Sequence, residues 1–193
     1  MIPRVLLLVL ATVGAVASCS SIQDARIGVS APDGTEQGFG PVSDFLDHRC
    51  GSLDCHGQPG RNLRVWGCEG MRLDPATSPA SCNRANRTTV DEHQATFRSL
   101  VGLEPQVMST VVQSHAHPEL LTFVRKARGI EAHKGGAIIT PGDDQDICIT
   151  SWLGVQIPND VPDADTFAGA TDTSACSRAQ GLPQFPILDA SAE

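Results

Sequence analysis

Apolar residues recur at helical spacing in several short segments, and polar, turn-rich stretches separate these segments from one another. Residues 90–101 form one such segment, and residues 137–140 are a short strand candidate. Further helices are expected where capping or terminal residues flank apolar positions: from Ser43 to Cys50, from Pro105, from Pro118 to Gly129, and from Asp143. The pattern predicts a mostly helical protein with long irregular loops.

The polar stretches divide the chain further. Residues 19–41 are rich in Ser, Gly, Asp and Pro and predict a flexible tether, whereas residues 57–89 are turn-rich and contain two cysteines. Residues 156–193 hold four prolines and few apolar clusters, so we expect a C-terminal extension that packs on the domain. The folded domain is predicted over residues 42–155.

The first 18 residues have the pattern of a secretory signal peptide, with Arg4 before an apolar run over 5–16 and small residues after it. The run is too short for a comfortable bilayer span. The stretch over 16–19, which ends at Cys19, resembles a bacterial lipobox and implies cleavage before a lipidated Cys19. An ordinary signal peptide cut near Ala17 is the alternative. We expect an exported protein held in the cell envelope by lipid alone, and Ser20 favours the outer membrane, facing the periplasm.

The charge excludes some partners. The formal net charge of the precursor is −8, and loss of Arg4 with the signal makes it −9. An acidic surface argues against nucleic acid and against docking on anionic lipid.

Export changes what the number of cysteines implies. Once Cys19 carries lipid, six of the seven cysteines remain, and an oxidising compartment favours disulfides. Three bridges would use all six, and one haem with two bridges would do the same. The hypothesis that fits the loops best joins Cys68 to Cys82 and Cys148 to Cys176, although spacing alone does not fix connectivity.

The remaining pair belongs to the most informative stretch of the chain. Cys50, Cys55 and His56 have the local order of a c-type haem attachment site, in which two thiols form thioethers and the histidine ligates iron. Four residues separate the cysteines here instead of the usual two. Two extra residues can bulge out of the loop, and Gly51 would help that turn. The alternative is a Cys50–Cys55 disulfide beside an incidental histidine.

Further motifs follow this stretch in a particular order. They are Cys-His-Gly at 55–57, Gly-Met-Arg-Leu-Asp at 70–74, His-Lys-Gly-Gly at 133–136, Pro-Gly-Asp at 141–143 and an apolar segment with Trp152 at 149–153. Together they resemble the small c-type cytochrome domains of bacterial periplasmic proteins, over roughly residues 42–155. The resemblance implies a cytochrome c-like helical fold with disulfide-stapled loops, and haem c attached to Cys50 and Cys55 with His56 as the proximal ligand.

The sequence indicates the second iron ligand less clearly than the first. We favour His133, whose neighbouring glycines allow a close approach to a macrocycle. Met108 lies on a helical apolar face, where methionine is more often part of the core. Met71 occupies a position that is normally Leu in the resembling domains.

The other candidate clusters give weaker evidence for a functional site. The alternation of His115 and His117 suits a metal, but neither acids nor thiols lie close in sequence, so a solvated loop is the better interpretation. Asp143, Asp144 and Asp146 do not have EF-hand spacing and are typical of an acidic helix start. The sequence contains none of the common hydrolase or nucleotide-binding motifs, so we do not expect an enzyme.

The sequence therefore yields two hypotheses. The first is a lipoprotein that binds haem c covalently and exchanges electrons with a redox partner protein in the periplasm. The second is a haem-free, disulfide-stapled structural or binding lipoprotein with a degenerate cytochrome c-like fold.

Overall fold

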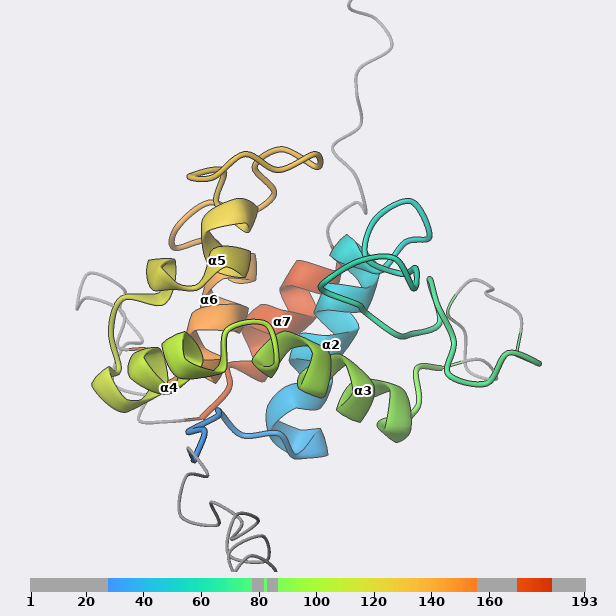
Figure 1. The fold of residues 1–193 in the computed structure, drawn as a ribbon, viewed down its shortest axis with the longest axis horizontal. Helices are drawn as coiled ribbons and strands as arrows, with labels where there is room; N and C mark the ends of the chain where they lie inside the picture. The colour runs from blue at the N-terminus through green and yellow to red at the C-terminus, as the bar shows by residue number, and fades with distance from the viewer. Residues whose placement is uncertain (1–27, 78–81, 83–86, 156–169, 182–193) are drawn as a thin grey trace, which may run out of the picture.

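The computed structural model describes residues 28–77, 82, 87–155 and 170–181 (Figure 1). Within these ranges the protein is mostly helical, as predicted, and its only bridge of β type is an isolated one between Trp66 and Met71. The expected signal peptide, Cys19, the first part of the tether and most of the C-terminal extension lie outside the described residues. The helices are α2 (Glu36–Cys50), α3 (Val90–Val101), α4 (Pro105–Ser114), the 3₁₀ helix η3 (Pro118–Leu120), α5 (Thr122–Ala127), α6 (Asp144–Trp152) and α7 (Thr173–Gln180).

Helix α2 lies at the centre and contacts α3, α6 and α7 (Figure 1). Its first turn is capped by Thr35, whose side chain accepts a hydrogen bond from the backbone N–H of Gly38. Phe39, Val42 and Phe45 are completely buried. The helix is therefore a core element that is covered by other helices on several faces.

The start of α2 corrects the predicted domain boundary. We expected a short helix capped by Ser43 and a tether that extended to residue 41, but the helix begins at Glu36 and includes Pro41. Proline inside a helix removes one N–H donor, a cost that burial of Phe39 on the preceding turn offsets. Residues 36–41 consequently belong to the folded domain.

Three aromatic side chains join the helices. The Phe39 ring lies 5.3 Å from the Phe97 ring of α3 and 5.0 Å from the Trp152 ring of α6, measured between ring centres. The indole N–H of Trp152 donates to the carbonyl of Asp33, 2.9 Å away. The ring contacts and this hydrogen bond together hold the chain at Asp33 and at Trp152 against α2.

Most of the other predicted helices are confirmed. Helix α3 has the predicted bounds and begins with a capping box formed by Thr89 and Glu92. Helix α4 begins at Pro105, and α6 begins after Asp143, whose side chain accepts from the backbone N–H of Asp146. The acidic residues at this helix start thus serve as a cap and, for Asp146, as the ion-pair partner of Arg128.

Two predicted elements differ in detail. The segment after Pro118 is divided into η3 and α5, because Leu121 is extended and the Glu104 carboxylate accepts hydrogen bonds from the backbone and hydroxyl of Thr122. The strand predicted at 137–140 is wrong: this stretch is a loop whose Ile138 and Ile139 N–H groups both donate to the carbonyl of Ala127.

The C-terminal extension contains an element that we did not predict. Helix α7 packs against α2 and α6, so α6 is not the last helix. The buried Cys148–Cys176 disulfide joins α6 to α7, and a second disulfide joins Cys68 to Cys82. Both predicted pairings are therefore present, and α7, the described part of the extension, packs on α2 and α6.

His93 forms a buried link between two helices that no sequence pattern indicated. Its ring is buried between α2 and α3, and its two nitrogens lie 2.9 Å from the carboxylates of Glu36 and Asp44. Burial lowers the pKa of His93, but the two carboxylates outweigh it and raise the pKa from 6.5 to about 8. The imidazolium is thus the form that links the two helices.

We expect this link to make stability depend on pH. Because the folded pKa is raised, the stabilisation is complete below the unfolded value of 6.5 and is lost as the pH rises through about 8. The expected loss is about 1 kcal/mol, since both carboxylates are partly exposed and therefore screened. Urea unfolding at about pH 6 and about pH 9 measures this loss. His93→Gln should reduce the difference by about this amount and His117→Gln should retain it; equal pH dependence in both variants would contradict the assignment.

Candidate functional site

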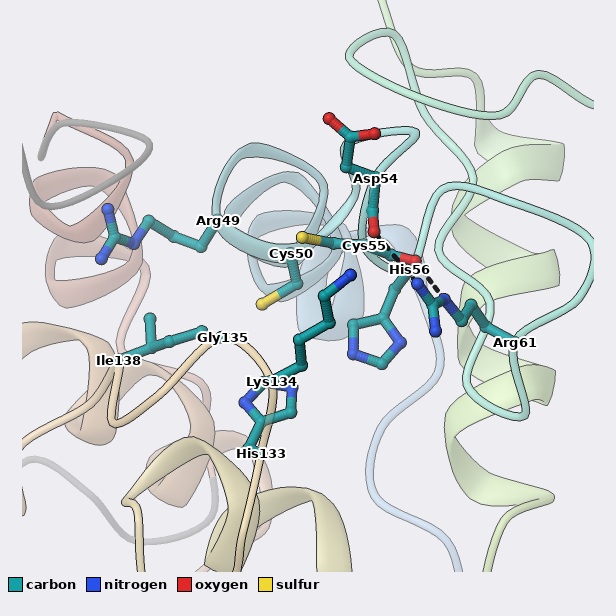
Figure 2. A pocket seen from close by; sticks show the side chains of 10 residues that line it. All are labelled: Arg49, Cys50, Asp54, Cys55, His56, Arg61, His133, Lys134, Gly135 and Ile138. Atoms are coloured by element: carbon teal, nitrogen blue, oxygen red, sulfur yellow. Dashed lines mark hydrogen bonds between the residues drawn. The ribbon is translucent and has the colours of Figure 1, made fainter.

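A cavity of about 360 Å³ opens where the end of α2, the loop after it and the loop after α5 meet (Figure 2). Its volume falls within the range of natural small-molecule sites, about 300–1,000 Å³. The side chains or backbone that line it belong to Arg49, Cys50, Asp54, Cys55, His56, Arg61, His133, Lys134, Gly135 and Ile138. Cys50, Cys55, His56 and His133, singled out from the sequence, are thus brought together.

The loop after α2 explains how the long cysteine spacer is accommodated. The N–H of His56 donates to the carbonyl of Cys50, and the N–H of Cys55 donates to that of Ser52, each over 2.9 Å. Leu53 and Asp54 at the tip of this turn are exposed. The extra length of the spacer therefore projects outward, as expected, while Cys55 and His56 return to the cavity.

Close backbone packing holds this loop in place. A Cβ atom added to Gly57 or to Gly70 would lie 1.8 Å from the carbonyl oxygen of Gly51. Any side chain at either position would therefore displace the loop. Gly51 itself has an ordinary helical conformation, and it lacks room for a side chain beside Asp47, so its contribution is small size and not an unusual turn.

His56 is held in the form that binds metals. Its Nδ1 donates to the carbonyl of Leu63, 3.1 Å away, which leaves Nε2 with a free lone pair. Burial lowers the pKa of His56 below 6.5; the hydrogen bond to Leu63 opposes this effect, and nearby His133 and Arg61 add to it. The imidazole is consequently neutral at neutral pH.

His133 approaches the same cavity from the loop after α5. Its Nδ1 donates to the carbonyl of Gly136 over 3.3 Å, so its Nε2 is also the acceptor nitrogen. The rings of His56 and His133 have centres 6.0 Å apart and planes 22° from parallel. Two imidazoles that ligate one metal ion from opposite sides, at the metal–nitrogen distance of about 2.0–2.1 Å, have ring centres about 6 Å apart. The separation of the two ring centres is in this range, and the rings are stacked beside each other in the cavity.

The two thiols on the cavity wall are free. Cys50 and Cys55 are not joined to each other, so the disulfide that the haem-free hypothesis expects is not formed here. Burial raises the pKa of Cys50 to about 12, and the positive charge of Arg49 opposes this only in part. The Cys50 thiol is accordingly neutral and a poor nucleophile at physiological pH.

Positive charge surrounds the cavity although the protein is acidic overall. Arg61 donates to the carbonyls of Cys55 and Asp54 and so ties the loop across the opening. Arg49 donates to the side-chain oxygen of Gln145. With Lys134, these cations outnumber the single acid, Asp54, and favour a ligand with anionic groups. No sequence pattern indicated a role for Arg61, which lies in a turn-rich loop.

The other candidates lie elsewhere. Met108 is almost fully buried in the core, as expected for a methionine on an apolar helix face, and Met71 pairs with Trp66. His115 donates to the carbonyl of Gly154 and His117 to the carboxylate of Glu119, so the two histidines have separate partners. Neither methionine and neither of these histidines lines the cavity.

Comparison with known proteins adds no family. No protein-family model, no curated protein and no solved structure matches the chain. Among the described residues, no helix combines the length and the apolar character that a bilayer span requires. The resemblance to c-type cytochrome domains therefore stays a prediction from the motifs.

The raised pKa of Cys50 predicts low reactivity. In haem-free protein at about pH 8, iodoacetamide should alkylate Cys50 far more slowly than in urea-unfolded protein, because a pKa of about 12 lowers the thiolate fraction by roughly a thousandfold. Peptide mass spectrometry over time measures each cysteine separately, and Cys50→Ser confirms the assignment. Alkylation of Cys50 at the same rate in folded and unfolded protein would show that its thiol is not buried.

Proposed function

We propose that this chain is an exported lipoprotein of the bacterial envelope that binds haem c covalently and carries single electrons. The observation that carries the proposal is the pair of imidazoles, His56 and His133, whose ring centres lie 6.0 Å apart beside two free thiols. The site has the donor set that covalent haem needs: two thiols for attachment and two imidazoles for the iron.

The residues have separate roles in this proposal. Cys50 and Cys55 would attach the macrocycle through thioethers, and His56 and His133 would ligate the iron through Nε2. When bound, the group supplies reversible one-electron oxidation and reduction, while the protein sets the potential through ligation and burial.

The chain's own groups prepare the site. The carbonyl of Leu63 orients His56 and holds its proton on Nδ1, and Gly136 does the same for His133. Arg61 and Lys134 place positive charge at the opening, which suits the carboxylates of a haem. His56 and His133 would both hold the iron, and a metal held by two protein imidazoles would favour electron transfer over bond chemistry.

The sequence supplies the cellular setting of the proposal. The signal over residues 1–18 and the lipidated Cys19 would bring the protein to the envelope, where haem c is attached and where a periplasmic redox partner is available. Contact with the membrane would be through the lipid, and an acidic surface is unsuited to nucleic acid.

The haem proposal is tested by expression in a host with haem c maturation. We expect a Soret band, a mass increase of one haem, and colour that survives denaturation in acid. His56→Ala should abolish the Soret band, whereas the matched loop variant His115→Ala should keep it, since His115 lies outside the cavity. A colourless protein with unmodified Cys50 and Cys55 would contradict the proposal and favour the haem-free structural lipoprotein.

The role of His133 is tested separately. His133→Ala should keep the covalent haem but change the iron from low-spin to high-spin, because one strong axial ligand is lost. Visible and electron paramagnetic resonance spectra measure the change, and exogenous imidazole should restore the low-spin form. Met108→Leu, a substitution in the core away from the cavity, serves as the control. A low-spin spectrum in His133→Ala together with a high-spin spectrum in Met108→Leu would exclude His133 as the ligand.

A further inference from the structure

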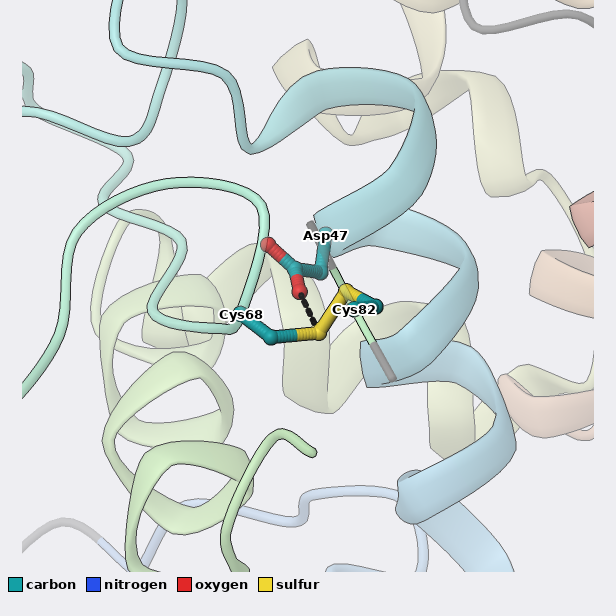
Figure 3. Close-up of side chains that lie close together, drawn as sticks. All are labelled: Asp47, Cys68 and Cys82. Carbon is teal, nitrogen blue, oxygen red and sulfur yellow. Dashed lines mark hydrogen bonds between the residues drawn. A yellow bond between two sulfur atoms is a disulfide. The ribbon is translucent and has the colours of Figure 1, made fainter. Parts of the chain in front are cut away.

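A second cavity, of about 450 Å³, lies along another face of α2 and contains the Cys68–Cys82 disulfide. The two sulfurs are in different surroundings: Cys68 is buried, whereas Cys82 is exposed. Asp47 of α2 extends to the buried sulfur (Figure 3). The donor atoms of these three residues lie within 4.8 Å of one another, but sulfurs that are bonded to each other are not thiolate ligands for a metal.

Several contacts hold the Asp47 carboxyl against this disulfide. Its Oδ2 lies 3.6 Å from Sγ of Cys68, and it accepts hydrogen bonds from the Thr88 hydroxyl over 3.0 Å and from the Glu69 N–H over 3.3 Å. The Thr88 hydroxyl oxygen is also 3.3 Å from the same sulfur. A Cβ on Gly67 would lie 2.0 Å from Oδ2, so glycine at that position makes room for the carboxyl.

Burial of the Asp47 carboxyl destabilises the fold. Asp47 is only 2 % exposed, and its Oδ1 has no hydrogen-bond partner. A buried carboxylate with an unsatisfied oxygen destabilises a fold unless the group is protonated. Burial raises the pKa of Asp47 to about 6; the hydrogen bonds from Glu69 and Thr88 oppose this, and the charges of Glu69 and Asp44 add to it. The group therefore exchanges its proton near neutral pH, next to a sulfur atom.

We propose that Cys68–Cys82 is a thiol–disulfide exchange centre in which Asp47 donates and accepts the proton of Cys68. The partner is a thiol, either a small molecule or an exposed protein cysteine. Its thiolate attacks Sγ of Cys82, the exposed residue of the pair, and forms a mixed disulfide. The bond to Cys68 breaks, the electron pair stays on Sγ of Cys68, and Asp47 gives that sulfur its proton.

A second thiolate completes the exchange. It attacks the sulfur of the first thiol, the mixed disulfide breaks, and Cys82 leaves as a thiolate that takes a proton from solvent. Two thiols are thereby oxidised to one disulfide, and Cys68–Cys82 is reduced to two thiols. In the reverse direction the Asp47 carboxylate removes the proton from the Cys68 thiol, so one group serves both directions.

The second disulfide of the protein serves as an internal control for the exchange reaction. Both cysteines of the Cys148–Cys176 disulfide are fully buried between α6 and α7, where an incoming thiolate has no access without unfolding. The proposal is also independent of haem, because the two cavities have different residues and the exchange does not use Cys50 or Cys55.

The test measures cleavage of each disulfide by dithiothreitol in the folded, full-length protein. Free thiols are first blocked with N-ethylmaleimide, newly released thiols are labelled with iodoacetamide, and peptide mapping follows each bridge. We expect Cys68–Cys82 to be cleaved while Cys148–Cys176 stays intact. After division by the thiolate fraction of the reagent, the rate should fall as the pH rises through about 6, because Asp47 loses its proton.

Variants separate Asp47 from its neighbours. Asp47→Asn should slow cleavage roughly tenfold or more at about pH 5.5 and remove the pH dependence. The other titratable and charged side chains of this cavity are those of Glu36, Asp44, His48, Glu69, Arg87 and His93. Glu69→Gln serves as the control and should keep the inflection. An intact Cys148–Cys176 bridge reports that each variant is folded. The proposal is overturned if Asp47→Asn leaves rate and pH profile unchanged, or if both bridges are cleaved at the same rate.

Discussion

The rings of Phe39, Phe97 and Trp152 pack together where α2, α3 and α6 meet, and this contact holds α2 in the centre of the protein. Each ring comes from a different part of the sequence, so the cluster closes long loops of chain around one helix. Aromatic pairs of this kind contribute about 0.5–1.5 kcal/mol beyond the burial of their area. The Cys148–Cys176 bridge reinforces the arrangement by joining α7 to α6. The position of every residue on α2 follows from this packing.

The last turns of α2 carry two chemically different sulfur environments. Cys50 ends the helix at one cavity, and Asp47, one turn earlier, reaches the disulfide at the other. At the first cavity burial keeps the thiol neutral, so Cys50 stays reduced and available beside His56. At the second, the sulfurs are already paired and a carboxyl beside them controls a proton. A single rigid helix thus separates a site for attachment from a site for exchange.

The sequence predicted elements that local signals mark and missed those that depend on distant partners. Helices α3 and α6 were found because Thr89 and Asp143 cap them before an apolar face. Helix α7 was missed because its buried residues, Ala175, Cys176 and Ala179, are too small to give a strong apolar pattern. The early start of α2 was hidden by Pro41, which usually indicates a helix end but is here offset by tertiary packing. His93 depends on carboxylates of another helix, which no local pattern shows.

At the candidate site, too, the sequence did not show which residues lie close together in space. The pairing of Cys68 with Cys82 and of Cys148 with Cys176 was a hypothesis about local staples, and the structure contains both bridges. The choice of His133 rested on its neighbouring glycines and on the order of motifs, since spacing along a chain gives no distance in space. The structure also shows that the two histidines are supported unequally. His56 is fixed by the end of α2 and by glycines packed against Gly51. His133 lies on a glycine-containing loop that Ile138 and Ile139 fasten to α5 through one carbonyl, that of Ala127. The position of the His56 side is therefore set by the core, and the width of the space between the imidazoles is set by the loop.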